Sequence, residues 1–161
     1  MVFGLRSLQS WCDIDLYQTS LSPGSLTMEK TNFENLQIYQ LSEKLADQIW
    51  RIVIGWENFG RATLGKQLIR AVDSVGANIA EGSGRGSEAE LRRFLRISRG
   101  SLYETKHWLR CAYKSRLLWE KQVAELLPIL KELTPKLNAY LRSVGSLKRS
   151  HASNKGKSAK T

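Results

Sequence analysis

The chain has 161 residues, which is enough for one ordinary domain. Hydrophobic residues make up 42% and charged residues 25%, and the 12 glycines and 3 prolines are too few for a fibrous or wholly disordered chain. The 25 Lys and Arg outnumber the 15 Asp and Glu and leave a net charge of +10, which suggests a polyanionic partner.

The sequence gives no sign of a disulfide framework, a zinc ribbon or a membrane span. Cys12 and Cys111 are the only cysteines and form no C-x-x-C pair. No apolar run approaches the roughly 18 residues that cross a bilayer, and the N-terminus lacks the layout of a secretory signal. We therefore expect a cytoplasmic protein that does not contact a membrane.

Both ends of the chain differ from its middle in composition. Residues 1–31 show no sustained periodicity, and we expect a flexible N-terminal extension. Met28 stands just before the first periodic stretch, so either translation starts there or the segment is a genuine arm. Residues 32–145 are the expected domain. Residues 146–161 carry five basic and no acidic residues with few apolar groups, and we expect a disordered basic tail.

The first two periodic stretches predict two helices. Apolar residues recur at three- and four-residue spacing from Phe33 until Gly55, and again from Leu64 to Ile79. We expect the second helix to end at Gly82, followed by a turn over residues 82–86 in which several glycines tolerate positive φ.

Two further helices follow this turn. Ser87-x-x-Glu90 predicts a capping box, and the third helix should run to about Lys114. The fourth should run from about residue 120 to 144, with a bend at Pro128 and Pro135. No stretch between residues 33 and 145 alternates with the period of a half-buried strand. The predicted fold is all-α, an antiparallel up-and-down four-helix bundle.

The third helix carries the most informative pattern in the chain. Its apolar residues share one face, and its cations share another arc without any acidic residue among them. This basic arc consists of Arg92, Arg93, Arg96, Arg99, Lys106, Arg110 and Lys114. We interpret it as a nucleic-acid-binding surface, with Arg85 in the preceding turn as a further phosphate contact. A solvated face, or one neutralised by glutamates of a neighbouring helix, is the alternative.

Three residues near the end of the second helix form a motif that we interpret as structural. Asn78 lies near the apolar stripe, so its amide needs internal partners. Glu81 can accept backbone N–H groups or pair with an Arg of the adjoining helix, and Gly82 begins the turn.

No catalytic, cofactor-binding or metal-binding set can be assembled, and we predict that the protein is not an enzyme. The turn over residues 82–86 lacks the Lys-Ser/Thr ending of a phosphate-binding loop. Glu104-x-x-His107 has the spacing used in di-iron bundles, but such a site needs a second motif and two more glutamates. With His107 and His151 as the only histidines, no catalytic triad can be built.

Two motifs carry a family resemblance. Asn78-Ile79-Ala80-Glu81-Gly82 and the run Phe94-Leu95…Arg99-Gly100-Ser101-Leu102-x-Glu104, with an opening at Phe33-Glu34-Asn35-Leu36, resemble the 23S rRNA intervening-sequence proteins, also called the four helix bundle protein family. The likeness covers about residues 30 to 145. It implies an up-and-down bundle assembled as a homopentamer. Relatives serve as nucleic-acid-binding accessory proteins to the reverse transcriptases of diversity-generating retroelements.

The sequence therefore predicts a non-enzymatic homo-oligomer that binds RNA or DNA through phosphate contacts. The alternative is a protein-interaction scaffold or an accessory subunit, for example of a reverse transcriptase, in which the basic arc pairs with protein partners.

Overall fold

The computed structural model describes residues 32–155, and it describes side chains over residues 32–144. The expectations for residues 1–31, including a translation start at Met28, and for residues 156–161 lie outside the described residues. The described part is helical and contains no strand. Its elements are α2 (Gln37–Ile54), α3 (Asn58–Gly60), one π-helical turn η1 (Arg61–Gly65), α4 (Lys66–Gly84), α5 (Glu88–Lys114) and α6 (Glu120–Lys155).

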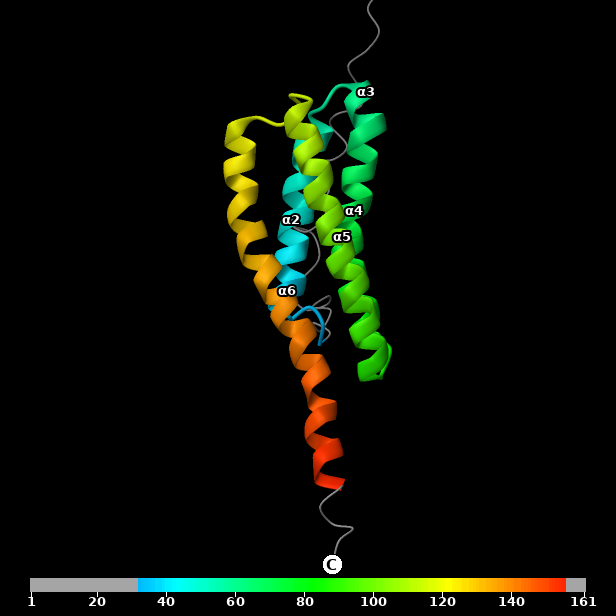
Figure 1. Ribbon diagram of the computed structural model, residues 1–161. Helices are drawn as coiled ribbons and strands as arrows, with labels where there is room; N and C mark the ends of the chain where they lie inside the picture. Colours follow the sequence, from blue (N-terminus) through cyan, green and yellow to red (C-terminus); the bar gives the residue numbers. More distant parts are fainter. Residues whose placement is uncertain (1–31, 156–161) are drawn as a thin grey trace, which may run out of the picture. The chain divides into compact units, whose positions relative to one another are not determined.

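The four long helices form an antiparallel bundle, which confirms the predicted fold (Figure 1). Helix α4 packs most extensively against α5, α2 lies against α4 and α6, and α5 also contacts α6. Each helix directs one apolar stripe into a common core. The fully buried side chains include Leu45, Ile49, Leu68, Val72, Leu95, Leu102, Leu133 and Leu137. Full burial of one such side chain contributes roughly 1.5–3 kcal/mol.

The first two helices begin at positions that differ from those predicted. Helix α2 starts four residues after Phe33. The preceding residues form a turn in which the backbone N–H of Leu36 donates to the carbonyl of Phe33. The Phe33 ring packs edge-on against Tyr39, with the ring centroids 4.8 Å apart. The second helical stretch starts at Asn58, earlier than expected. Here the buried Trp56 packs close to Gly65.

The predicted turn over residues 82–86 is shorter than expected. Gly82 and Gly84 remain helical, and Gly86 is the position with positive φ, at 68°. Gly82 is needed for packing instead, since a Cβ atom there would lie 2.8 Å from the Cβ of Phe94 in α5. The Ser87 hydroxyl accepts from the Glu90 backbone N–H at 3.2 Å, as the capping box predicts.

Helix α6 extends further than its apolar pattern indicates. It contains both Pro128 and Pro135, and its ribbon curves along its length (Figure 1). It continues beyond Val144 to Lys155, through part of the segment expected to be disordered. Gly145 is the only strong helix breaker over residues 145–155, and a formed helix propagates readily through Ser, Lys, Arg and Ala. None of the described helices is long and apolar enough to cross a membrane.

Candidate nucleic-acid interface

The packing of α5 determines which of its faces meets solvent. Phe94, Leu95, Leu102 and Leu109 are buried. The small residues Ser98, Thr105 and Ala112 are buried on the same side, and the Ser98 hydroxyl donates to the α4 backbone carbonyl of Val75 at 2.9 Å. This close contact between helices α4 and α5 fixes the rotation of α5, so the opposite side carries the basic arc.

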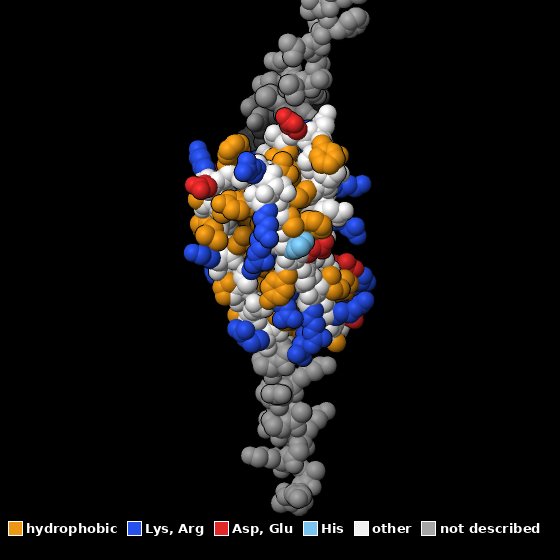
Figure 2. All heavy atoms as spheres, turned by 45° about the horizontal axis from the view of Figure 1, so that its top comes forward, with side chains coloured by type: hydrophobic (Ala, Val, Ile, Leu, Met, Phe, Trp, Pro, Cys, Tyr) orange, Lys and Arg blue, Asp and Glu red, His pale blue; other side chains and the backbone are white. Residues whose placement is uncertain are grey.

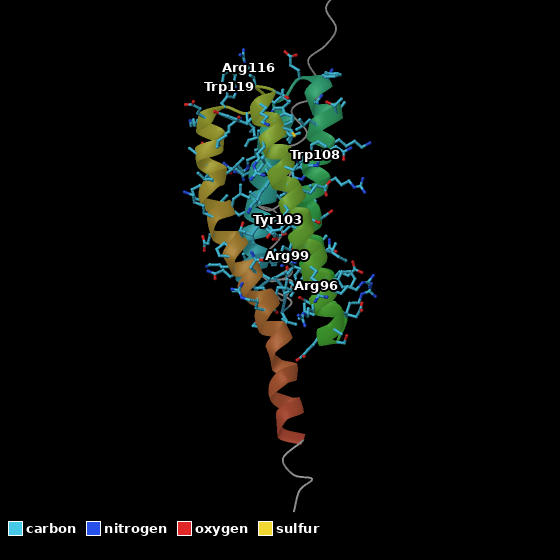
Figure 3. All side chains as sticks on the ribbon, in the orientation of Figure 1. Arg96, Arg99, Tyr103, Trp108, Arg116 and Trp119 are labelled. Atoms are coloured by element: carbon cyan, nitrogen blue, oxygen red, sulfur yellow. The ribbon has the colours of Figure 1, made fainter. Side chains whose placement is uncertain are left out.

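Five cations of the basic arc have neither an ion-pair partner nor a side-chain hydrogen bond within the described part of the chain. Arg92, Arg96, Arg110 and Lys114 are exposed and Arg99 is half-buried. Helix α5 holds seven cations but only three acidic residues, Glu88, Glu90 and Glu104. Arg96 and Arg99 precede Tyr103 along the helix (Figure 3). Over residues 32–144, no glutamate of a neighbouring helix forms an ion pair with these five cations.

Arg93 and Arg85 have partners. Arg93 lies 3.2 Å from the Glu90 carboxylate in an exposed pair, which contributes little stability. Arg85 pairs with Glu81, so that carboxylate takes a partner from its own segment rather than from the adjoining helix. Both guanidinium groups also lie over the Phe94 ring, 5.3 Å from its centroid for Arg85 and 5.5 Å for Arg93.

Lys106 lies at the edge of the basic arc and differs from its other members. Its Nζ donates to the Thr134 hydroxyl of α6 at 2.6 Å. Partial burial lowers the pKa of Lys106, and the positive charge of Arg110 lowers it further. Lys106 therefore connects α5 to α6 as well as adding to the positive field.

Asn78 lies in α4 and forms a hydrogen bond within its own helix. It is half-buried, and its side-chain amide donates to the backbone carbonyl of Ser74 at 2.7 Å. Gly82, one turn later, packs closely on Phe94 of α5.

An open groove of about 940 Å³ lies beside the basic arc, between α5 and α6. Its lining is mainly apolar and includes Leu109, Tyr113, Leu126, Leu127, Leu130 and Pro135. The charged residues along it are Lys106, Arg110, Lys114 and Lys131, with Glu120 as the acidic one. The face seen in Figure 2 carries Lys and Arg side chains interspersed with hydrophobic ones.

A comparison with protein families matches residues 34–139 to the model described as 23S rRNA-intervening sequence protein. The chain belongs to this family. Its fold is similar to a crystal structure of a protein with unknown function from the S23 ribosomal protein family of Bacteroides thetaiotaomicron. The two share 23% identity and a TM-score of 0.60, and the match covers 65% of this chain and 95% of the other. The search of curated proteins found no match.

Two exposed tyrosines of α5 lie beside the basic arc, and the sequence patterns did not single them out. Tyr103 and Tyr113 are each 50% exposed, and the Lys106 ammonium lies 5.6 Å from the centroid of the Tyr103 ring. The position of Tyr103 between arc cations could have been found from the helical period. The groove could not, because its second wall belongs to α6 and depends on which faces of two helices meet.

His107 and Cys111 lie one turn apart on α5, with Nε2 and Sγ 3.6 Å apart. The nearby Glu104 accepts a hydrogen bond from the Trp108 indole at 3.3 Å. Over the described residues, no group of three or more His, Cys, Asp or Glu side chains is arranged to hold a metal ion.

Proposed function

We propose that this member of the 23S rRNA-intervening sequence protein family binds RNA or DNA through phosphate contacts made by the basic arc. The observation that carries the proposal is the set of five cations that have neither an ion-pair partner nor a side-chain hydrogen bond among the described residues, namely Arg92, Arg96, Arg99, Arg110 and Lys114. A cation that lacks an internal partner can replace a counterion on a phosphate without first breaking an ion pair.

The arrangement of the basic arc favours binding that does not depend on the nucleotide sequence. The arc follows the outside of one helix, and its members are long flexible side chains suited to phosphate oxygens. Phosphate contacts position a protein on a nucleic acid but read no bases. We propose a non-enzymatic role, because this surface offers positive charge and shape for binding and no set of groups for catalysis is proposed on it.

The proposed binding can be tested by reversing the charge of Arg92, Arg96 and Arg99 together to Glu. We expect affinity for a fluorescein-labelled RNA oligonucleotide to fall at least tenfold, about 1.4 kcal/mol. The helical circular dichroism should be unchanged, since these side chains lie off the buried stripe. Fluorescence anisotropy at fixed salt measures the affinity.

A matched control changes Lys44, Lys66 and Arg70, exposed residues of α2 and α4, to Glu. This variant has the same net charge, and we expect it to retain most of the affinity. Equal loss in both variants would show that net charge, not the basic arc, determines binding. If the arc variant instead loses a protein partner or dissociates into monomers, the arginines pair with protein and the scaffold function is correct.

We also propose that the protein is a homo-oligomer, as the family resemblance implies a homopentamer. Support comes from one end of the bundle, where three large side chains are 61% (Ile54), 82% (Phe59) and 73% (Trp119) exposed. They belong to the end of α2, to α3 and to the turn before α6, and Leu117 beside Trp119 lies against Gly60 of α3. Exposed apolar groups gathered in this way are typical of interaction surfaces.

The oligomer is tested by changing Phe59 and Trp119 together to Ser. Each substitution removes exposed apolar area that a second copy would cover, so we expect the molar mass from light scattering to fall toward that of the 18.3 kDa chain. The helical circular dichroism of the variant should be unchanged, because neither side chain is buried within the bundle. A wild-type protein that is monomeric at micromolar concentration would contradict the proposal.

A further inference from the structure

We infer that the groove between α5 and α6, together with Tyr103, receives the unpaired bases of a single-stranded nucleic acid. The inference rests on the proposed function, because the same strand would place its phosphates on the basic arc. It adds what that function leaves open, namely which form of nucleic acid the protein prefers and which groups it contacts besides phosphate.

The groove and the basic arc share a rim. Arg110 and Lys114 belong to the arc and also line the groove, and Lys131 lies on the opposite wall. The floor between them is apolar, with Leu109, Leu126 and Leu130. An occupant that matches this surface carries regularly spaced negative charges on one side and flat apolar surface on the other, which describes one strand with its bases unpaired.

The size and extent of the surface fit a strand rather than a small anion. A groove of about 940 Å³ lies at the upper end of the range for ligand pockets, so it has room for more than one base. The arc extends beyond the groove, since Arg92 and Lys114 are 22 residues apart and therefore about 33 Å apart along the helix. A single bound phosphate would use only a small part of this length.

Two aromatic rings are placed to stack on bases. Tyr113 lines the groove, and Tyr103 lies ten residues earlier, about 15 Å along α5, on the exposed side. Both rings are 50% exposed. Loss of one base–aromatic stack weakens single-strand binding by roughly fivefold to a hundredfold.

A duplex cannot use the groove. Its bases are paired and stacked inside the helix, so only its phosphates would meet the basic arc. We therefore expect the protein to bind a single strand more tightly than a duplex of the same length, although the duplex has the higher charge density.

The test measures the anisotropy of three labelled probes of equal length with the full chain: a single-stranded RNA, the same strand made abasic, and an RNA duplex. We expect the unmodified strand to bind at least tenfold more tightly than the abasic strand and the duplex. The abasic strand keeps the phosphates and loses only the bases, so this difference isolates base contacts.

The variant Ala124→Trp fills the groove without changing charge, because Ala124 is exposed and lines it. Ala139→Trp is the matched control, at an exposed position of α6 outside the groove lining. We expect Ala124→Trp to lower the affinity for the unmodified strand at least fivefold, toward that for the abasic strand, because the base contacts in the groove are lost while the stack on Tyr103 remains. Ala139→Trp should leave the affinity unchanged. The double variant Tyr103→Ala, Tyr113→Ala should also lower the affinity for the unmodified strand. Its affinity for the abasic strand should be unchanged, because the phosphate contacts remain.

Several results would overturn the inference. Equal affinity for unmodified and abasic strands would mean that phosphates alone are bound, which leaves the proposed function intact. A change in oligomeric mass caused by Ala124→Trp would assign the groove to a contact between copies. If an acidic amphipathic peptide binds in the groove and displaces none of the RNA probes, the groove belongs to a protein partner. If none of the three probes binds, the proposed function fails together with the inference.

Discussion

Tyr39 shows how one polar group is held in a specific charge state at the edge of the core. Its hydroxyl donates to the Glu43 carboxylate at 2.7 Å, and its ring packs against Phe33. Burial and the neighbouring carboxylates of Glu43 and Glu34 raise the pKa of Tyr39 from 10.0 to about 12. The fold therefore favours the neutral phenol.

This shift predicts a pH dependence of stability. Between about pH 10 and pH 12 the unfolded chain loses the Tyr39 proton while the folded chain keeps it, so the free energy of unfolding falls as pH rises. Below pH 10 the contribution is fully present. We expect Tyr39→Phe to show a smaller decrease than the wild type over this range, measured by urea denaturation. An identical slope for both proteins would contradict the assignment.

The contact between α4 and α5 depends on Gly82. A Cβ atom at this position would lie 2.8 Å from the Cβ of Phe94 and 3.4 Å from the Cα of Leu91, so the two helices would have to separate. Gly100 of α5 is the opposite case, since nothing lies within 4 Å of a Cβ atom added there.

The two glycines therefore predict opposite effects of the same substitution. We expect Gly82→Ala to lower the free energy of unfolding by roughly 1–3 kcal/mol through overpacking. Gly100→Ala should raise it by about 0.8–1 kcal/mol, because alanine has the higher helix propensity. Chemical denaturation of both variants measures the difference. Stabilisation by Gly82→Ala would mean that α4 and α5 can shift apart without loss.

Much of the fold could be predicted from the apolar period of each helix taken separately. The predictions are wrong at positions where two helices contact each other. The apolar stripes identified the core and the end of α5, because each stripe depends only on the period of its own helix. The glycines predict a turn that begins too early after α4, because contact with Phe94 in α5, and not flexibility, requires Gly82. The basic arc was found in the same way as the stripes. The bond from Lys106 to Thr134 was not, because it joins α5 to α6.

The excess of positive charge is divided between the bundle and the C-terminal end of the chain. If the five unpaired cations of the basic arc each contact a phosphate of a single strand, the logarithm of the binding constant should fall against the logarithm of salt concentration with a slope of about −3.5. Residues 146–161 carry five more basic residues. Deleting them should make the slope shallower by up to about 0.7 for each phosphate contact that is lost. A salt titration of both proteins gives the two slopes, and identical slopes would exclude the tail from binding.

The absence of ion-pair partners for these cations within residues 32–144 also has a cost for the free protein. Arg92 and Arg96, and likewise Arg110 and Lys114, are four residues apart on α5, where like charges repel by a few tenths of a kcal/mol for each pair. Salt and bound phosphates both relieve this repulsion. Like-charge repulsion therefore destabilises helix α5 at low salt, so added salt should stabilise the fold under the same conditions that should weaken the proposed binding of a nucleic acid.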